Sequence, residues 1–383
     1  MANALKKLSL LLAAVFAVLC TAGPPLTRGR TQGRAETPPS NWRPGRDPGG
    51  VGYVGGKTCA GCHTHEAATY TAAPMANASA PAADCEILKR LAPLTFREGP
   101  YSYQITRRDG QSVYSVSDGA GTISEPILYC FGQGVAGQTY IFRHGDSLYE
   151  GRVSFFQKLG GLNITILHPR EIPRSLAAAV GRRMSPEGAR GCFACHTTAA
   201  VSGSELKLER LAPGVSCEAC HGPGERHVAA VRAKNFKQLE IFNPGNLDAL
   251  DLTQEFCGTC HVSFEEVLQM PEQGGVGNIR FQPYRLLKSR GHLMNDRRIS
   301  CVACHDPHGE LRRDADFYDS KCTACHLNGP REVKTKERAA AACPVATRQC
   351  VTCHMPKVEL PEMHFKFTDH WIRTPRPDEP TPK

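Results

Sequence analysis

The sequence predicts a mainly α-helical and irregular fold with a small inserted β module, and two observations lead to this prediction. A short pattern of two cysteines and a histidine occurs at residues 59–63 and six more times between residues 192 and 354. Six copies in so short a stretch leave too little chain for an ordinary apolar core. Alternating apolar and polar residues, the pattern of half-buried strands, are clearest within residues 86–170. We therefore expect a short first segment at 51–85, a β module at 86–170 and a larger domain at 171–373.

The repeated pattern is Cys-x-x-Cys-His, and its spacing suits the covalent attachment of haem. Two cysteines three positions apart form thioether bonds to the two haem vinyl groups, and the next histidine lies under the iron. A chain of this composition would contain roughly 0.04 copies by chance. We therefore expect seven haems c, attached in chain order at seven motifs: Cys59 and Cys62, Cys192 and Cys195, Cys217 and Cys220, Cys257 and Cys260, Cys301 and Cys304, Cys322 and Cys325, Cys350 and Cys353. The expected proximal iron ligands are His63, His196, His221, His261, His305, His326 and His354.

Seven porphyrins would take the place of an apolar interior, so the predicted fold is haem-packed. Zinc binding, thioredoxin-like redox chemistry and disulfide bonding account for the cysteines less well. A zinc site needs paired half-sites that close a tetrahedron, and does not require a histidine after every pair. A thioredoxin-like motif occurs once, beside a βαβ pattern. A disulfide framework would not place a histidine after every second cysteine.

Both ends of the chain are predicted to lie outside the folded part. Lys6 and Lys7 precede an apolar run from Leu8 to Cys20, and small residues follow. This pattern predicts a signal peptide at residues 1–22, with a membrane anchor as the alternative. Residues 23–50 and 374–383 are rich in proline and predict a disordered linker and a disordered tail. Export predicts a periplasmic or cell-surface location.

The bare polypeptide carries a formal net charge of +9, which in isolation suggests an anionic partner. Each oxidised haem adds roughly −1 through its two propionates, so the loaded protein would be close to neutral. No basic run alternates with aromatic residues. The sequence therefore does not predict a nucleic-acid partner.

Within the β module, two hairpins are expected. Alternating runs at 101–108 and 111–116 flank Asp109-Gly110, a strong turn signal. A second pair of runs, at 138–142 and 148–155, surrounds His144-Gly145-Asp146. Helical patches are expected at 62–73, 227–241 and 334–342.

Eight histidines outside the motifs compete for the second axial position of the haem irons. His65 and His308 follow a proximal histidine by two and three residues, so neither reaches the opposite face of the same haem. The expected distal ligands are His227, His292, His308, His364 and His370, with Met75 as a further candidate that would raise the potential of its haem. His144 and His168 are equally compatible with a structural role, and His65 with the solvent-exposed surface.

Four cysteines remain outside the motifs: Cys20, Cys85, Cys130 and Cys343. Cys20 would leave with the signal peptide. In an oxidising compartment two of the other three can pair, and Cys85 with Cys130 is the favoured pair because they flank one segment. The sequence does not determine the connectivity, and a leftover thiol is the alternative.

With these residues in view, the chain resembles multihaem cytochromes related to the tetrahaem cytochrome c of ammonia oxidisers. More distantly, it resembles the pentahaem nitrite reductases and octahaem hydroxylamine oxidoreductases. The stretches that carry the resemblance are YVGGKTCAGCHTHEAATYTAAPMANAS (53–79), GVSCEACHGPGERH (214–227), CVACHDPHG (301–309) and CVTCHMPKVELPEMHFKFTDHWIRTPRP (350–377). The resemblance implies that His227 and His308 are distal ligands. The segment ILYCFGQGVAGQTYIF (127–142) is similar to a β insert in members of this group.

Two functions agree with these observations. The first is an electron carrier that passes electrons between redox partner proteins, alone or in a membrane or cell-surface respiratory complex. The second is a haem enzyme that acts on a small nitrogen or sulfur compound at a five-coordinate haem. All seven motifs end in histidine, whereas the nitrite reductases use a lysine at their catalytic haem, and no counterpart of the cross-linking tyrosine of the hydroxylamine oxidoreductases stands out. No catalytic residue is therefore transferred, and electron transfer is favoured.

Overall fold

The structure is a computed structural model that describes residues 44, 50–270, 275–289, 298–326, 343 and 345–374. The predicted signal peptide, most of the predicted linker and nearly all of the predicted tail lie outside the described residues. His292 and the expected helix at 334–342 lie outside them as well. Within the described part, no helix has the length and apolar character needed to cross a bilayer.

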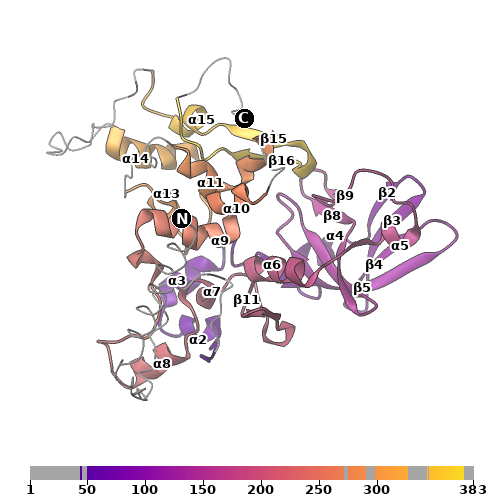
Figure 1. Ribbon diagram of the computed structural model, residues 1–383, viewed down its shortest axis with the longest axis horizontal. Coiled ribbons are helices and arrows are strands. Elements are labelled where there is room, and N and C mark those ends of the chain that lie inside the picture. The colour runs from indigo at the N-terminus through magenta and orange to yellow at the C-terminus, as the bar shows by residue number, and fades with distance from the viewer. Residues whose placement is uncertain are drawn as a thin grey trace, which may run out of the picture. The chain divides into compact units, whose positions relative to one another are not determined.

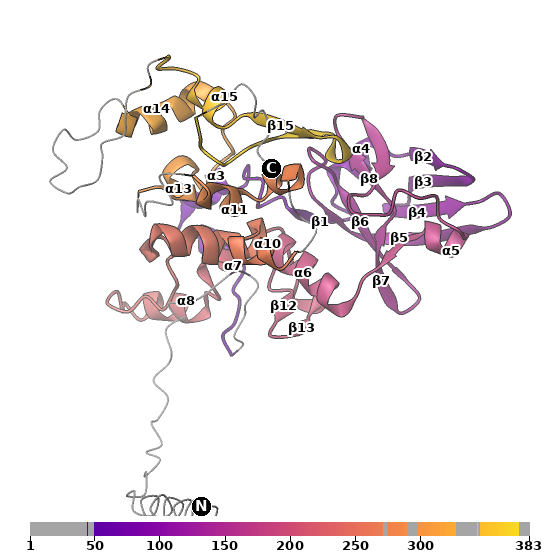
Figure 2. The ribbon, with the colours of Figure 1, turned by 45° about the horizontal axis from the view of Figure 1, so that its top comes forward.

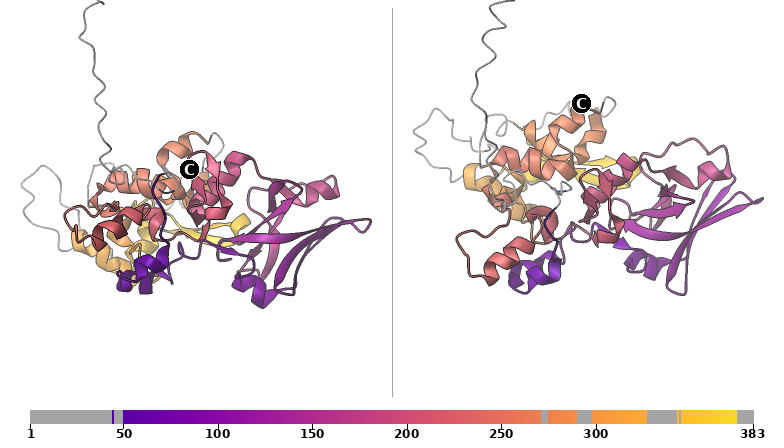
Figure 3. Two further views of the ribbon diagram at one scale, coloured as in Figure 1. Left: turned by 90° about the horizontal axis from the view of Figure 1, so that it is seen from below. Right: turned by 60° about the horizontal axis from the view of Figure 1, so that its bottom comes forward.

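A large antiparallel sheet dominates residues 79–183 (Figure 1). Its strands follow the order β10-β7-β6-β5-β4-β3-β2. Strand β1 lies outside this order and pairs with the last three residues of β5, 129–131. Figure 3 shows how strongly the long strands twist. The strands are β1 (Ser79–Pro81), β2 (Leu94–Glu98), β3 (Tyr101–Arg108), β4 (Gln111–Ser117), β5 (Thr122–Phe131), β6 (Thr139–His144), β7 (Ser147–Gly151) and β10 (Gly181–Arg183).

Both predicted hairpins are present. β3 and β4 join through Asp109 and Gly110, whose φ angles of 48° and 80° are the left-handed values that a tight hairpin turn requires. β6 and β7 pair from Ile141 to His144 and turn at Gly145. A further hairpin, β8 (Val153–Phe156) with β9 (Gly161–Ile164), packs beside the sheet.

The largest apolar core belongs to this β module. Alternate residues of β3 and β4 point inward, and Tyr103, Ile105, Tyr114 and Val116 are almost completely buried. The short helices α4 (Glu86–Leu91) and α5 (Leu176–Ala179) contribute Leu88 and Ala179 to the same cluster. This part of the chain therefore folds around ordinary side-chain packing.

The prediction of a mainly α-helical fold with a small β module is wrong. The sheet has seven strands on one path and an eighth beside them, and it extends on both sides of residues 86–170. Two of the strands that the prediction did not name lack a clear alternating pattern of their own: β10 reads Gly-Arg-Arg, and β5 is interrupted by Pro126 and a bulge between Ile127 and Tyr129. Their neighbours specify them, because pairing partners and burial decide strand formation more than intrinsic preference does.

The rest of the described chain consists of short helices, turns and small hairpins (Figure 2). Ser185 caps α6 (Pro186–His196) and Ser263 forms a capping box with Glu266 at α10 (Phe264–Leu268). Apolar clusters here are small, for example Phe242, Leu252 and Phe256. The expected helical patches at 62–73 and 227–241 correspond in part to α3 (Thr64–Tyr70) and α8 (Glu225–Arg232).

Candidate haem-binding sites

Each Cys-x-x-Cys-His motif lies on or directly beside a short helix. A helix places residues three apart on one face, so both thiols of a motif point to the same side and the histidine follows them. The fourth motif begins in a π-helix, η3 (Asp251–Cys257), and such segments often occur at functional sites. The other motif helices are α2 (Gly56–Ala60), α6, α7 (Cys217–His221), α9 (Gly258–His261), α13 (Cys301–Cys304), α14 (Ala315–His326) and α15 (Cys350–His354).

The seven motifs form one connected set. The motif helices adjoin in the pairs α2 with α7, α6 with α9, η3 with α13, and α14 with α15. Thiols of these motifs also lie close enough to influence each other's pKa, in the pairs Cys59 with Cys217, Cys195 with Cys260, Cys257 with Cys301, and Cys322 with Cys350. Cys220 and Cys257 border the same apolar cluster, and α13 contacts α14. Numbered in chain order, the motifs therefore adjoin along the path first, third, fourth, fifth, sixth and seventh, with the second beside the fourth.

Three of the motif histidines each face a histidine from outside the motifs. The ring centroids lie 6.3 Å apart for His63 and His227, 6.0 Å for His221 and His308, and 6.2 Å for His305 and His370. A metal–nitrogen distance of about 2 Å puts two imidazoles on opposite sides of one metal roughly 6 Å apart between centroids. The residues present therefore fit three irons with two histidine ligands each.

Several of these rings are held in the tautomer that binds metal. The Nδ1 atoms of His196, His221 and His354 donate to the backbone carbonyls of Ala78, Phe242 and Arg373, at 3.2, 3.0 and 2.7 Å. Because Nδ1 carries the proton, Nε2 remains available as a ligand. His227 and His370 are oriented in the same way by the carbonyls of Leu239 and Thr368.

Burial also favours the neutral, metal-binding form of the imidazole. It lowers the pKa of His196, His221, His261 and His305 below the ordinary value. Burial likewise lowers the pKa of His370, to about 4. These rings can thus bind a metal at neutral pH without first losing a proton.

A buried ion pair fixes the loop that carries His370. Arg285 donates from Nε and Nη2 to both oxygens of Asp369, at 2.8 and 2.7 Å, and both side chains are almost completely buried. Arg373 and the Trp371 amide bind the same carboxylate. The Asp369 carboxylate therefore anchors the residue next to His370, and no sequence pattern marked it.

His144 and His168 are engaged by carboxylates of the β module. His144 Nδ1 lies 2.7 Å from Glu125 Oε1, and His168 Nε2 lies 3.1 Å from Glu150 Oε2. Both histidines therefore have structural partners, which agrees with the structural role that the sequence left open for them.

Among the described residues, the ring contacts pair no other candidate ligand with a motif histidine. His364 lies near the β8–β9 hairpin, where its Nε2 accepts from Asn163 Nδ2 at 3.0 Å. His65 is exposed on α3. Met75 is half-buried and its carbonyl accepts from Val215 N, two residues before the third motif.

Sequence reasoning missed three side chains that support the motifs. Phe131, on β5, stacks on His196 with centroids 5.1 Å apart and rings inclined by 2°. The buried Glu218 carboxylate accepts from the amides of Val54, Gly55 and Gly224, each at 2.8 Å, and so ties the first segment to α7. Asp319 accepts from the amides of Gln349 and Cys350 and anchors α15. The sequence offers one weak signal for two of them: Glu218 lies within the third motif, and Asp319 lies three residues before the sixth.

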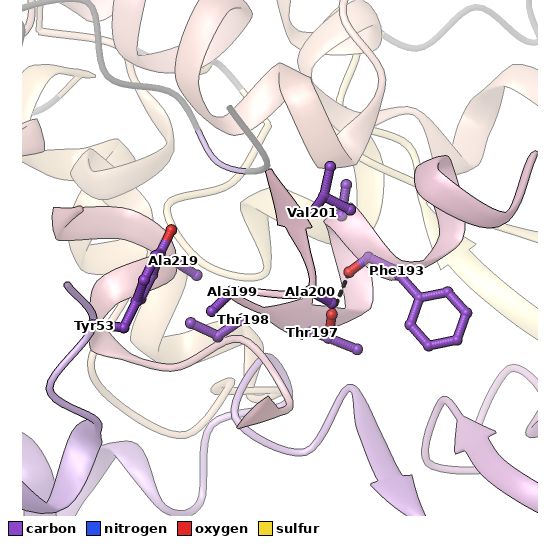
Figure 4. Close-up of a pocket in the computed structure, with 9 residues that line it drawn as sticks. Tyr53, Phe193, Thr197, Thr198, Ala199, Ala200, Val201 and Ala219 are labelled. Atoms are coloured by element: carbon purple, nitrogen blue, oxygen red, sulfur yellow. Dashed lines mark hydrogen bonds between the residues drawn. The ribbon is translucent and has the colours of Figure 1, made fainter. Parts of the chain in front are cut away.

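A cavity of 10 Å³ lies between the second and third motifs, with space for a single water molecule. Figure 4 shows Tyr53 at one side of it and the Thr197 hydroxyl bonded to the Phe193 carbonyl at the other. A cavity of this size holds no organic substrate.

Comparison with known proteins agrees with the motif chemistry. A family model described as cytochrome c554 and c-prime matches residues 170–222, which include the second and third motifs. The multiheme cytochrome MtrA of Shewanella baltica (strain OS185) is 26% identical over an alignment that covers 38% of this chain and 56% of MtrA. The chain thus spans just over half the length of this curated relative. The solved structure of outer cell wall cytochrome OcwA has a TM-score of 0.47 at 16% identity, covering 84% of this chain and 79% of OcwA.

The family-model match and the similarity to MtrA support a multihaem cytochrome c, a class of protein that transfers electrons. Covalently bound haem c is the cofactor of that class. The more specific resemblance to the tetrahaem cytochrome of ammonia oxidisers stays a prediction.

Proposed function

We propose that this chain is a seven-haem cytochrome c that transfers electrons between redox partner proteins outside the cytoplasm. The observation that carries the proposal is the spacing of 6.0 to 6.3 Å in three histidine pairs, each joining a motif to a histidine elsewhere in the chain. That spacing suits an iron with two imidazole ligands, which has no open position for a substrate and is suited to electron transfer.

From the same three histidine pairs we also propose which distal ligand serves which haem. His227 would serve the haem of the first motif, His308 that of the third and His370 that of the fifth. The haem would supply the redox chemistry, while these side chains would orient it and set its potential.

The order of the motifs supports a route for electrons. Neighbouring motifs adjoin from the first to the seventh through the third, fourth, fifth and sixth. We propose that electrons enter and leave at the two ends of this row or at the second motif, which branches from the fourth. The partners would be redox proteins of a membrane or cell-surface respiratory complex.

The location of the protein is proposed from the N-terminal pattern alone. Two lysines, a short apolar run and small residues favour export, and haem attachment at Cys-x-x-Cys-His motifs agrees with it. Localisation of the full chain by cell fractionation would check this part, with a variant of residues 1–22 that carries a charge within the apolar run as the control.

Two measurements on purified protein test the proposal. Intact mass under denaturing conditions should show the polypeptide plus seven covalently bound haems. Electron paramagnetic resonance of the oxidised protein should show predominantly low-spin iron. Fewer than seven bound haems, or none, would contradict the haem count, whereas seven haems with mostly high-spin iron would contradict the ligand assignment.

A haem enzyme is the second candidate, and the partners of three histidines favour it. His144, His168 and His364 are bonded to Glu125, Glu150 and Asn163, so five spare histidines remain for seven irons. An iron without a sixth ligand could bind a small nitrogen or sulfur compound. Binding of nitrite, hydroxylamine or carbon monoxide to the native protein, together with a high-spin signal, would favour this candidate over a pure electron carrier.

A further inference from the structure

Cys85 and Cys130 belong to no motif, and the fold brings them together in the core of the β module. They are 2% and 0% exposed and lie in the same apolar cluster. The two thiols lie close enough for each to shift the pKa of the other. Two cysteines 45 positions apart in the chain thus share one buried site.

The backbone around the two residues explains this contact. Ala80 of β1 is the register partner of Cys130 in β5, and the Ala82 amide donates to the Leu128 carbonyl. The chain then turns, with the Cys85 amide donating to the Ala82 carbonyl, so that Cys85 returns over β5. Cys85 Sγ also donates to Gln138 Oε1 at 3.0 Å, which holds the thiol in place.

We propose that Cys85 and Cys130 form a disulfide in the mature protein. Unlike the motif cysteines, neither has a haem vinyl group to react with. One S–S bond would form as two S–H bonds break. The two electrons and two protons would pass to the disulfide of a thiol–disulfide oxidoreductase, which leaves as a dithiol. This inference rests on the proposed extracytoplasmic location, where such oxidants act.

The bridge would also stabilise the surroundings of the second motif. Phe131 follows Cys130 in β5, and its ring stacks on His196. A link from Cys85 to Cys130 would fix this part of β5 to the segment that leads from the first motif into the sheet. The two cysteines would therefore hold the β module against one haem site through Phe131.

Alkylation of the full-length holoprotein tests this proposal. The protein is denatured, treated with iodoacetamide with or without prior reduction, and analysed by intact and peptide mass spectrometry. We expect no alkylation of Cys85 and Cys130 without reduction, a peptide pair linked through them, and alkylation of both after reduction. Alkylation of both residues without reduction would overturn the proposal, as would a linked peptide that joins either residue to Cys343.

Matched variants separate this result from the proposed function. Cys343→Ala removes an exposed cysteine and should leave the linked peptide intact. Cys85→Ala should make Cys130 reactive without reduction in the denatured protein. The same intact mass reports the number of haems. A linked peptide in protein that carries fewer than seven haems would support the disulfide and contradict the haem count.

Discussion

The imidazole rings of His221 and His308 are nearly parallel, inclined by 9°, with their centroids 6.0 Å apart. His221 completes the third motif, and His308 lies three residues beyond the fifth. The Asp306 carboxylate accepts from the His308 amide at 2.9 Å and so shapes the turn that presents this ring. The segment after one motif thus supplies a ligand to another, which ties the proposed haem sites into one folding unit.

Replacing His308 by alanine should convert one haem of the seven to the high-spin state. The substitution removes the proposed distal ligand of the third motif, while thioether bonds and His221 would still hold the proposed haem. Electron paramagnetic resonance and intact mass together provide the measurement, with haem content expected to be unchanged. His65→Ala is the control, because His65 is exposed and should leave the spectrum as it is. An unchanged low-spin spectrum of His308→Ala would contradict the proposal that His221 and His308 bind the same iron.

Replacing Tyr318 by phenylalanine should raise the potential of one haem. The Tyr318 hydroxyl donates to the Arg312 carbonyl at 2.9 Å and accepts from His305 Nδ1 at 3.2 Å. At the proposed haem of the fifth motif, loss of this acceptor would make the imidazole a weaker electron donor to the iron and would destabilise the oxidised form. A hydrogen bond of about 1 kcal/mol corresponds to about 40 mV for a one-electron couple.

Spectroelectrochemical titration would measure this shift. Tyr101→Phe is the matched control, because it removes a hydroxyl that donates to the Pro173 carbonyl in the β module, away from the motifs. Equal titration curves for the two variants would mean that Tyr318 only packs against His305.

The sequence allows a definite prediction of the motif chemistry because covalent attachment needs a fixed local spacing. Two cysteines and a histidine within five residues can be recognised without knowing the fold. The hairpin at Asp109-Gly110 was predictable for the same reason, since its turn is local. Strand β10, in contrast, pairs with β7 at a distance of about thirty residues, and its three residues Gly181–Arg183 carry no periodic pattern.

The sequence predicts a set of candidate distal ligands, but it does not predict which motif each of them would serve. His227 and His308 look alike in sequence, since each follows a motif by a few residues, yet they face His63 and His221 of other motifs. His364 shows the limit more clearly. It follows the seventh motif much as His370 does, but lies beside Asn163 of the β module instead of a motif histidine. Such choices depend on tertiary contacts, which a single sequence does not display.

Replacing Glu218 by glutamine should destabilise the protein by about 2 kcal/mol, because three backbone amides lose a charged acceptor. The side chain is buried, and a glutamine amide would point a donor at one of the donors of Val54, Gly55 and Gly224. Thermal unfolding of the holoprotein measures the effect. Glu225→Gln is the matched control, since Glu225 accepts from the Gly52 amide at the exposed surface. A loss as small as that of the control would mean that Glu218 does not anchor the first segment.

Acidification should destabilise the β module in part through Glu150. Burial alone would raise the pKa of this carboxyl, but hydrogen bonds and charge from His168 and Arg182 outweigh it and hold the pKa below its ordinary value. A group whose pKa is lower in the folded state stabilises that state at higher pH, and the contribution disappears as the pH falls through the folded-state pKa. As the pH falls below the ordinary pKa of a glutamate carboxyl, thermal stability of the wild type should therefore fall more steeply than that of Glu150→Gln. Glu205→Gln provides the comparison, because Glu205 pairs with Lys207 at the protein surface, where screening by solvent weakens the pair. If the Glu150→Gln and wild-type stability curves stay parallel in acid, the Glu150 carboxylate does not contribute through its ionisation.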